Sequence, residues 1–197
     1  MVGDSVSIQD RDLLGRLSSY FDKIDVRLRE GQGWLIFNAD RGRAGRVSQF
    51  IGDRLREYRP LVSSYLIPWR DFALNAYMLK VELVANPVPL STGDADVDSR
   101  QQQEYAIAGR VSQDMYYHMC YCDLLVLSGV DPAYPHELGY LDQVMNTRYN
   151  NQRASILITP RMPHELAAEF EVLAGRFGNE AWQRFFGQLY KTCLIAL

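Results

Sequence analysis

The chain has 197 residues, of which 47% are hydrophobic and 23% charged, and its formal net charge is −3. This composition is typical of a folded globular protein, and the length suits one domain with a full hydrophobic core. The charge balance gives no overall positive field that would draw the molecule onto nucleic acid.

The three cysteines are Cys120, Cys122 and Cys193, an odd number without a usual zinc or redox spacing. Their apolar neighbourhoods predict reduced, buried thiols, which are typical of cytosolic proteins. Residues 1–10 carry acidic and polar side chains before any apolar run, unlike a signal peptide. No apolar stretch is long enough to span a bilayer. We therefore expect a cytoplasmic protein without membrane contact.

Helical and strand patterns alternate along the chain. An amphipathic helix is expected over 10–29, a buried strand over 34–37, and a Gly- and Arg-rich turn over 40–46 that leads into a helix ending near Tyr58. The remaining expected elements are a strand at 62–67, a helix at 69–83, an exposed loop at about 85–98, a helix at 100–120, a strand at 123–127, a helix at 136–149, a strand at 154–159, helices at 163–177 and 182–190, and a strand at 193–197.

This alternation predicts βαβ crossovers and a mostly parallel, five-stranded sheet covered on both faces. The expected fold class is therefore a three-layer α/β domain. Residues 1–30 would form an N-terminal helix leading into a domain at 31–197.

The turn after the first strand is where such sheets usually bind ligands. In a phosphate-binding loop of the form G-x-x-x-x-G-K-[ST], amides cradle phosphates, the lysine reaches the terminal phosphates and the hydroxyl holds Mg²⁺. The corresponding stretch here is Asp40-Arg41-Gly42-Arg43-Ala44-Gly45-Arg46-Val47. Gly45 keeps the second glycine, whereas Asp40, Arg46 and Val47 replace the first glycine, the lysine and the hydroxyl.

Several segments in consistent order resemble the DnaC- and IstB-type AAA+ family, whose members load replicative helicases or assist transposition. They are Tyr20–Phe37, Ile67–Phe72, Cys122–Leu127, Leu141–Tyr149, Ser155–Thr159 and Gly178–Arg184. The resemblance covers roughly residues 15 to 197. It implies a P-loop NTPase-like (AAA+) domain.

The resemblance also implies which catalytic groups are missing. The family's third strand ends in two acids that organise Mg²⁺ and activate water, and here Ser128 and Gly129 stand in those positions. Arg161 follows the fourth strand where the family has an asparagine that positions water. Because phosphoryl transfer depends on these parts, we expect no meaningful ATP hydrolysis, no bound cofactor and no metal site.

Five arginines are candidates for contacts with anions or neighbouring subunits. Arg41, Arg43 and Arg46 cluster near a predicted helix N-terminus, which attracts anions, although they could equally pair with acids of the same chain or of a neighbouring subunit. Arg184 stands where the family carries its arginine finger; the alternative is an ordinary surface arginine. Arg148 is either an intersubunit contact or a capping residue near a helix C-terminus.

These observations lead to a non-catalytic, AAA+-like interaction or scaffold subunit that assembles with itself or with an active AAA+ relative. One alternative is a helicase-loader or transposition-type adaptor that binds DNA and a partner protein. A second alternative is a slow nucleotide-binding hydrolase. A protein partner and an oligomer or hetero-complex are expected, and nucleic-acid binding stays open.

Overall fold

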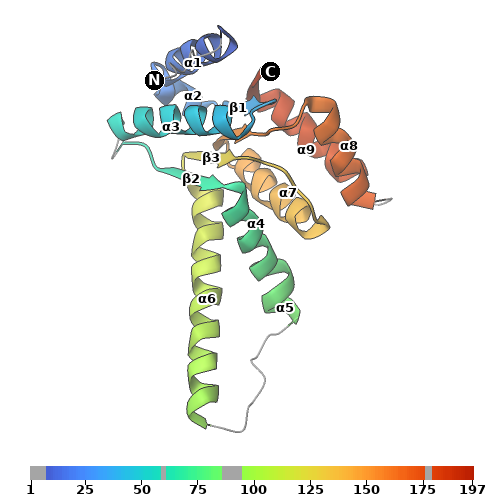
Figure 1. The fold of residues 1–197 in the computed structure, drawn as a ribbon. Helices are drawn as coiled ribbons and strands as arrows, with labels where there is room; N and C mark the ends of the chain where they lie inside the picture. Colours follow the sequence, from blue (N-terminus) through green and yellow to red (C-terminus); the bar gives the residue numbers. More distant parts are fainter. Residues whose placement is uncertain (1–7, 59–60, 86–94, 176–178) are drawn as a thin grey trace, which may run out of the picture.

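The computed structural model of the chain describes residues 8–58, 61–85, 95–175 and 179–197, and the elements within these ranges alternate as expected (Figure 1). The strands are β1 (Gly33–Ile36), β2 (Ser64–Pro68), β3 (Leu124–Ser128), β4 (Ala154–Ile158) and β5 (Cys193–Ala196). The helices are α1 (Ile8–Phe21), α2 (Ile24–Arg29), α3 (Arg41–Glu57), α4 (Trp69–Tyr77), the π-helix η1 (Met78–Glu82), α5 (Leu83–Ala85), α6 (Ala95–Tyr121), α7 (Pro135–Asn150), α8 (Pro163–Ala174) and α9 (Asn179–Thr192).

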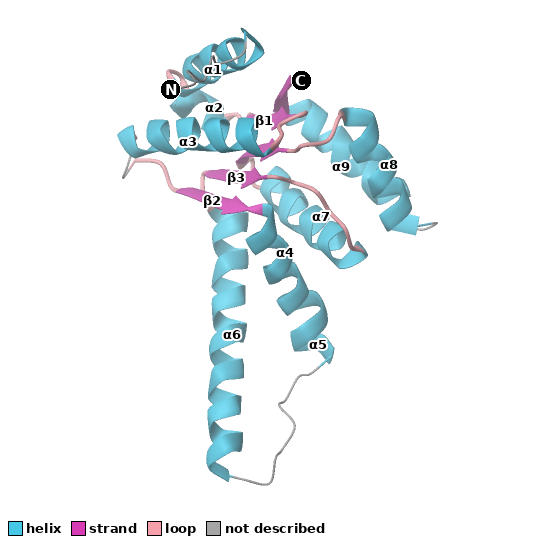
Figure 2. Cartoon of the chain, in the orientation of Figure 1, coloured by secondary structure: helices cyan, strands magenta, loops and turns pink. Residues whose placement is uncertain are grey.

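The five strands form one sheet in the order β2-β3-β4-β1-β5, and every pair of neighbours is parallel (Figure 2). The predicted α/β fold with a five-stranded sheet is thus confirmed, including the short C-terminal strand beside β1. Gly33 is required where β1 meets β4, because a Cβ there would lie 1.8 Å from the main-chain oxygen of Ser155.

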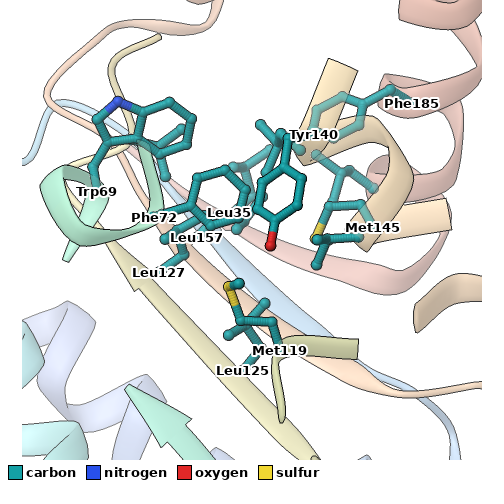
Figure 3. Close-up of a cluster of buried hydrophobic side chains, with 14 of the residues drawn as sticks. Leu35, Trp69, Phe72, Met119, Leu125, Leu127, Tyr140, Met145, Leu157 and Phe185 are labelled. Carbon is teal, nitrogen blue, oxygen red and sulfur yellow. The ribbon is translucent and has the colours of Figure 1, made fainter. Parts of the chain in front are cut away.

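Alternate residues of the three central strands, β3, β4 and β1, enter two separate cores. Trp34 and Ile36 of β1 pack with α1, α2 and α3 on one face of the sheet. Leu35 and Phe37 face the opposite side, where α4, α7, α8, α9 and the last turn of α6 cover the sheet. Figure 3 shows Leu35 among the side chains of this second core. The two-sided burial explains why the strands read as short, continuous apolar runs.

The N-terminal half differs from the sequence-based expectation in two places. The helix expected over 10–29 is two helices, since the chain breaks at Asp22 and Lys23 before α2 begins. The turn expected over 40–46 is wrong: α3 already begins at Arg41, so Gly42 and Gly45 are helical. Neither glycine is needed there for a left-handed backbone, because the glycines with positive φ among the described residues are Gly31, Gly129 and Gly175.

Between β2 and β3 the chain forms a helical arm, made of α4, η1, α5 and α6. Figure 1 shows α6 running well beyond the sheet, with α4 and α5 beside its upper part. The helix expected over 100–120 starts earlier, at Ala95, so residues 95–98 belong to α6 and not to the expected loop. Residues 86–94 of that loop lie outside the described residues.

Candidate functional site

The carboxyl ends of the parallel strands border an open groove of about 540 Å³. The segments after β1, β2, β3 and β4 all contribute to it, as expected for the ligand-binding edge of such a sheet. Its lining residues are Ala39, Arg41, Ala44, Gly45, Ser48, Pro68, Trp69, Arg70, Ser128, Gly129, Asp131 and Pro160. The structure therefore brings the first-turn residues and the end of β3 together, as the sequence predicted.

The start of α3 is capped by a carboxylate. Asp40 Oδ1 accepts a hydrogen bond of 2.7 Å from the backbone N–H of Arg43. A side-chain oxygen of this kind satisfies one of the free N–H groups at a helix N-terminus. In a phosphate-binding loop these N–H groups face the phosphates. Here one of them is engaged by the chain's own carboxylate, whose charge would also repel a phosphate.

Two of the residues that line the groove are arginines exposed to solvent. Arg41 and Arg70 are both exposed, and neither forms an ion pair or side-chain hydrogen bond with another described residue. Arg41 was predicted as an anion contact, whereas Arg70 was missed. Arg70 could have been predicted from its position just after the second strand. Because the carboxyl ends of parallel strands lie at the same side of a sheet, residues that follow the first and second strands lie near one another.

Arg43 and Arg46, the other two arginines near the start of α3, do not line the groove. The Arg43 guanidinium donates from Nη1 to the main-chain oxygens of Phe37 and Asn38, at 3.3 and 3.2 Å, and from Nη2 to that of Leu197, at 3.0 Å. Arg43 Nε and Arg46 Nη2 lie 3.0 and 2.6 Å from the carboxylate of Asp10 in α1. Arg43 is only 7% exposed, so the expectation of an intersubunit or external anion contact is wrong for it. These contacts match the alternative of pairing within the chain.

The ends of β3 and β4 hold a second charged cluster. Gly129 adopts φ 74°, which turns the chain away from β3 after Ser128. Arg161 lies 2.8 Å from Asp131 and 2.7 Å from Glu169, so it balances two acids. Hydrogen bonding to Asp131 raises the pKa of Arg161, and burial raises the pKa of the Glu169 carboxyl. The Arg161 guanidinium is thus paired with two carboxylates beside the groove.

Arg148 is fully buried and cannot reach another subunit. Its guanidinium donates to Ser155 Oγ and to main-chain oxygens of the α6–β3 junction and of β4, which belong to Met119, Cys122, Asp123 and Ala154. Burial lowers the pKa of this group. The intersubunit expectation is wrong for Arg148, because the side chain ties four segments of one chain together and caps the end of α6.

Arg184 is a surface residue of α9. Its guanidinium is about half exposed and lies 2.8 Å from Asp142 of α7. The described residues include no group of three or more His, Cys, Asp or Glu side chains placed to hold a metal ion. Among the same residues, no helix is long and apolar enough to cross a membrane.

The cysteines are held in their thiol form. Burial raises the pKa of Cys193 to about 12, and it also raises the pKa values of Cys120 and Cys122. Because the thiolate is the reactive species, these side chains are poor nucleophiles near neutral pH. They contribute to packing and provide no catalytic group.

The chain is similar to the crystal structure of the DnaC helicase loader, with a TM-score of 0.59 and 15% sequence identity over 97% of this chain and 92% of that chain. No family model and no curated protein matches the sequence. At this identity the similarity establishes the fold alone, which is an α/β domain with a parallel sheet in the order β2-β3-β4-β1-β5.

Proposed function

We propose that this chain is a non-catalytic binding subunit built on an AAA+ fold, and that it assembles with itself or with an active AAA+ relative. The observation that carries the proposal is at the start of α3. There the Asp40 carboxylate accepts a hydrogen bond from a main-chain N–H group that, in a phosphate-binding loop, would face the phosphates of the nucleotide. Lysine and hydroxyl side chains are also missing there, since Arg46 and Val47 occupy those positions and Val47 is buried.

The end of β3 supports the same proposal. Ser128 and Gly129 offer no carboxylate for Mg²⁺ or for activating water. Asp131, the nearest acid, already pairs with Arg161. The end of β3 thus lacks the carboxylates that hold Mg²⁺ and position the attacking water in phosphoryl transfer.

The helical arm offers a surface for a protein partner. Leu74 and Val84 on its α4–α5 side are 61% and 69% exposed, and Ile107 and Val111 on α6 are 45% and 52% exposed. Exposed apolar side chains that gather on one projecting element mark surfaces where partners bind. The apolar arm is therefore the part of the molecule that we assign to assembly.

Catalysis is tested with purified protein and ATP in the presence of Mg²⁺. We expect no turnover above a blank and no saturable binding of a labelled ATP analogue. A rate that disappears when Arg41 and Arg70 are both changed to Ala would instead favour a slow hydrolase, because these side chains line the groove. A rate that the double substitution leaves unchanged would point to contamination.

Assembly is tested by light scattering coupled to size exclusion, with the chain alone and with an active AAA+ relative. We expect a species larger than one chain in at least one of these samples. The double substitution Leu74→Glu and Val84→Glu should shift it toward the monomer, whereas Gln102→Glu, on an exposed polar position of α6, should not. A chain that is monomeric in both samples would contradict the proposal.

A helicase-loader or transposition-type adaptor is the second candidate, and Arg41 and Arg70 favour it because both are exposed and unpaired at one groove. DNA binding through these residues would weaken with salt, as phosphate contacts release counterions. Fluorescence anisotropy with single- and double-stranded DNA tests this. Loss of binding in Arg41→Ala/Arg70→Ala, with Arg184→Ala unaffected, would support DNA binding at this groove, and no binding at low salt would contradict it.

A further inference from the structure

The two edges of the sheet, β5 and β2, are protected to different extents. At β5, Ala196 bonds to the chain after β1, so the main-chain oxygens of Ile195 and Leu197 point away from the sheet. Arg16 Nη2 and Arg43 Nη2 donate to these two oxygens, each at 3.0 Å. Side chains of the same chain therefore cover the outer carbonyl groups of β5, which blocks the pairing of a further strand there.

The outer backbone groups of β2 have no such cover. The N–H group of Leu124 donates to the main-chain oxygen of Ser63 at 3.1 Å, which sets the alternation of the β2–β3 ladder. In a parallel pair, Ser63 and Tyr65 then bond to β3, whereas the N–H and C=O groups of Ser64 and Leu66 point outward. None of these outward groups forms a hydrogen bond with another described residue. The edge at β2 is thus open to a further strand.

A second groove, of about 500 Å³, lies beside the start of β2. Residues 63–65 form one wall, and the last turns of α6 form the other (Figure 2). Tyr117 and Tyr121 of α6 are 60% and 43% exposed, with their ring centroids 4.7 Å apart, and His118 stacks on Tyr65 at 5.9 Å. Extended peptides bind in grooves of this kind, between an edge strand that supplies backbone hydrogen bonds and side-chain pockets that give specificity.

Two carboxylates lie close to the helical side of this second groove. Asp114 precedes Tyr117 and His118 by three and four residues, so it shares their face of α6. Burial, and after it the Asp71 carboxylate of α4, raise the pKa of Tyr65, which places Asp71 near that ring. Both acids are exposed, and neither pairs with another described residue. Their charge favours a basic side chain here and disfavours a phosphate backbone.

We propose that β2 and the last turns of α6 form a docking site for an extended segment of a partner protein. The segment extends the sheet by bonding to the backbone of Ser64 and Leu66, and it packs an apolar or aromatic side chain against Tyr117. A lysine or arginine of the segment lies near Asp71 and Asp114. The site is separate from the exposed apolar side chains of the arm and from the groove at the carboxyl ends of the strands, so it stands independently of the function proposed above.

Ser64→Pro tests the site, because proline lacks the N–H group that faces the open edge and leaves the bonds from β2 to β3 in place. Ser64→Ala is the matched control, since it keeps that group. A displayed library of random dodecapeptides is selected on the natural chain, and fluorescence anisotropy then measures the enriched peptides on each variant. We expect alternating apolar side chains with a lysine or arginine, binding about tenfold weaker to Ser64→Pro, and unchanged binding to Ser64→Ala.

Two further measurements keep the test decisive if Ser64→Pro does not fold. Tyr117→Ala should weaken binding about tenfold, as loss of an aromatic anchor does, whereas Tyr134→Ala, at a 59% exposed position before α7, should not. On the natural chain, N-methylation of alternate peptide amides in one register should abolish binding. Methylation in the other register should not, because only alternate amides of an added strand face β2.

The proposal is overturned if no peptide is enriched, if the enriched peptides are acidic, or if they bind Ser64→Pro and Ser64→Ala equally. It is also overturned if peptides methylated in either register bind alike. Oligothymidine binding that Tyr117→Ala abolishes and Ser64→Pro retains would replace it with base stacking on the tyrosines. A natural chain that is dimeric in light scattering, and monomeric as Ser64→Pro, would replace it with a second copy at this edge.

Discussion

Among the described residues, Arg148 is the largest polar side chain that is fully buried, and none of their carboxylates accepts a hydrogen bond from it. Its partners are a hydroxyl, a thiol and main-chain oxygens, so the guanidinium satisfies carbonyl groups at the end of α6 and the start of β4. An arginine is suited to this role because its fork directs several N–H groups to different acceptors at once. Arg148, for which the sequence left open an intersubunit contact or a cap near a helix C-terminus, is thus part of the core.

Arg148→Met should lower the free energy of unfolding by about 3 kcal/mol or more, because several buried carbonyl oxygens would lose their donor. Urea unfolding followed by circular dichroism measures the change. Arg184→Met is the matched control, since an exposed pair is worth about 1 kcal/mol or less. Equal losses in the two variants would contradict the structural role of Arg148.

The presence of each helix and strand was predicted more reliably than the residues at which it begins and ends. The short apolar runs identified all five strands, because a sheet covered on both faces has no polar side. The start of α3 was placed too late, since Gly42 and Gly45 resemble a turn in the sequence. The helix tolerates both because neighbouring arginines and Ala44 favour helix, and Asp40 fixes its first turn. The contact from Asp10 to Arg43 and Arg46 could not be predicted, because it depends on how α1 docks on α3.

Asp40→Ala should destabilise the protein by about 1 kcal/mol, as removal of a helix cap usually does, whereas Asp40→Ser should retain most of the stability. Chemical denaturation of the three chains tests this difference. Equal losses in Asp40→Ser and Asp40→Ala would show that the charge of Asp40, rather than its capping hydrogen bond, is what α3 needs.

At the scale of the whole molecule, α1 is part of the same hydrophobic core as β1. Tyr20 packs edge-on against Trp34 at 6.3 Å between ring centroids, and the Arg16 guanidinium lies 5.0 Å from the centre of that indole ring. Without α1 the buried Trp34 would lose its contacts with Tyr20 and Arg16. Residues 10–30 therefore form part of the helical layer on this face of the sheet.

A chain lacking residues 1–23 should lose fixed tertiary packing. We expect a weaker near-ultraviolet circular dichroism signal, a red-shifted tryptophan emission and binding of a hydrophobic dye. Adding a peptide of residues 1–23 should restore the dichroism signal. A truncated chain that unfolds cooperatively at the same temperature as the full chain would show that α1 is dispensable.

Helix α6 has 27 residues, so it is about 40 Å long, and it runs without interruption from the distal arm to the amino end of β3. Its last turn is fastened by Arg148, whereas α4, at the other side of the arm, starts beside the groove at Pro68 and Trp69. The arm is thus attached at two places, at the carboxyl end of β2 and at the amino end of the neighbouring strand β3. A partner bound at the amino end of α6 would transmit force along α6 to the contacts of Arg148. A shift of α4 relative to α6 would move Arg70 at the groove, so that binding at the arm would be coupled to the groove.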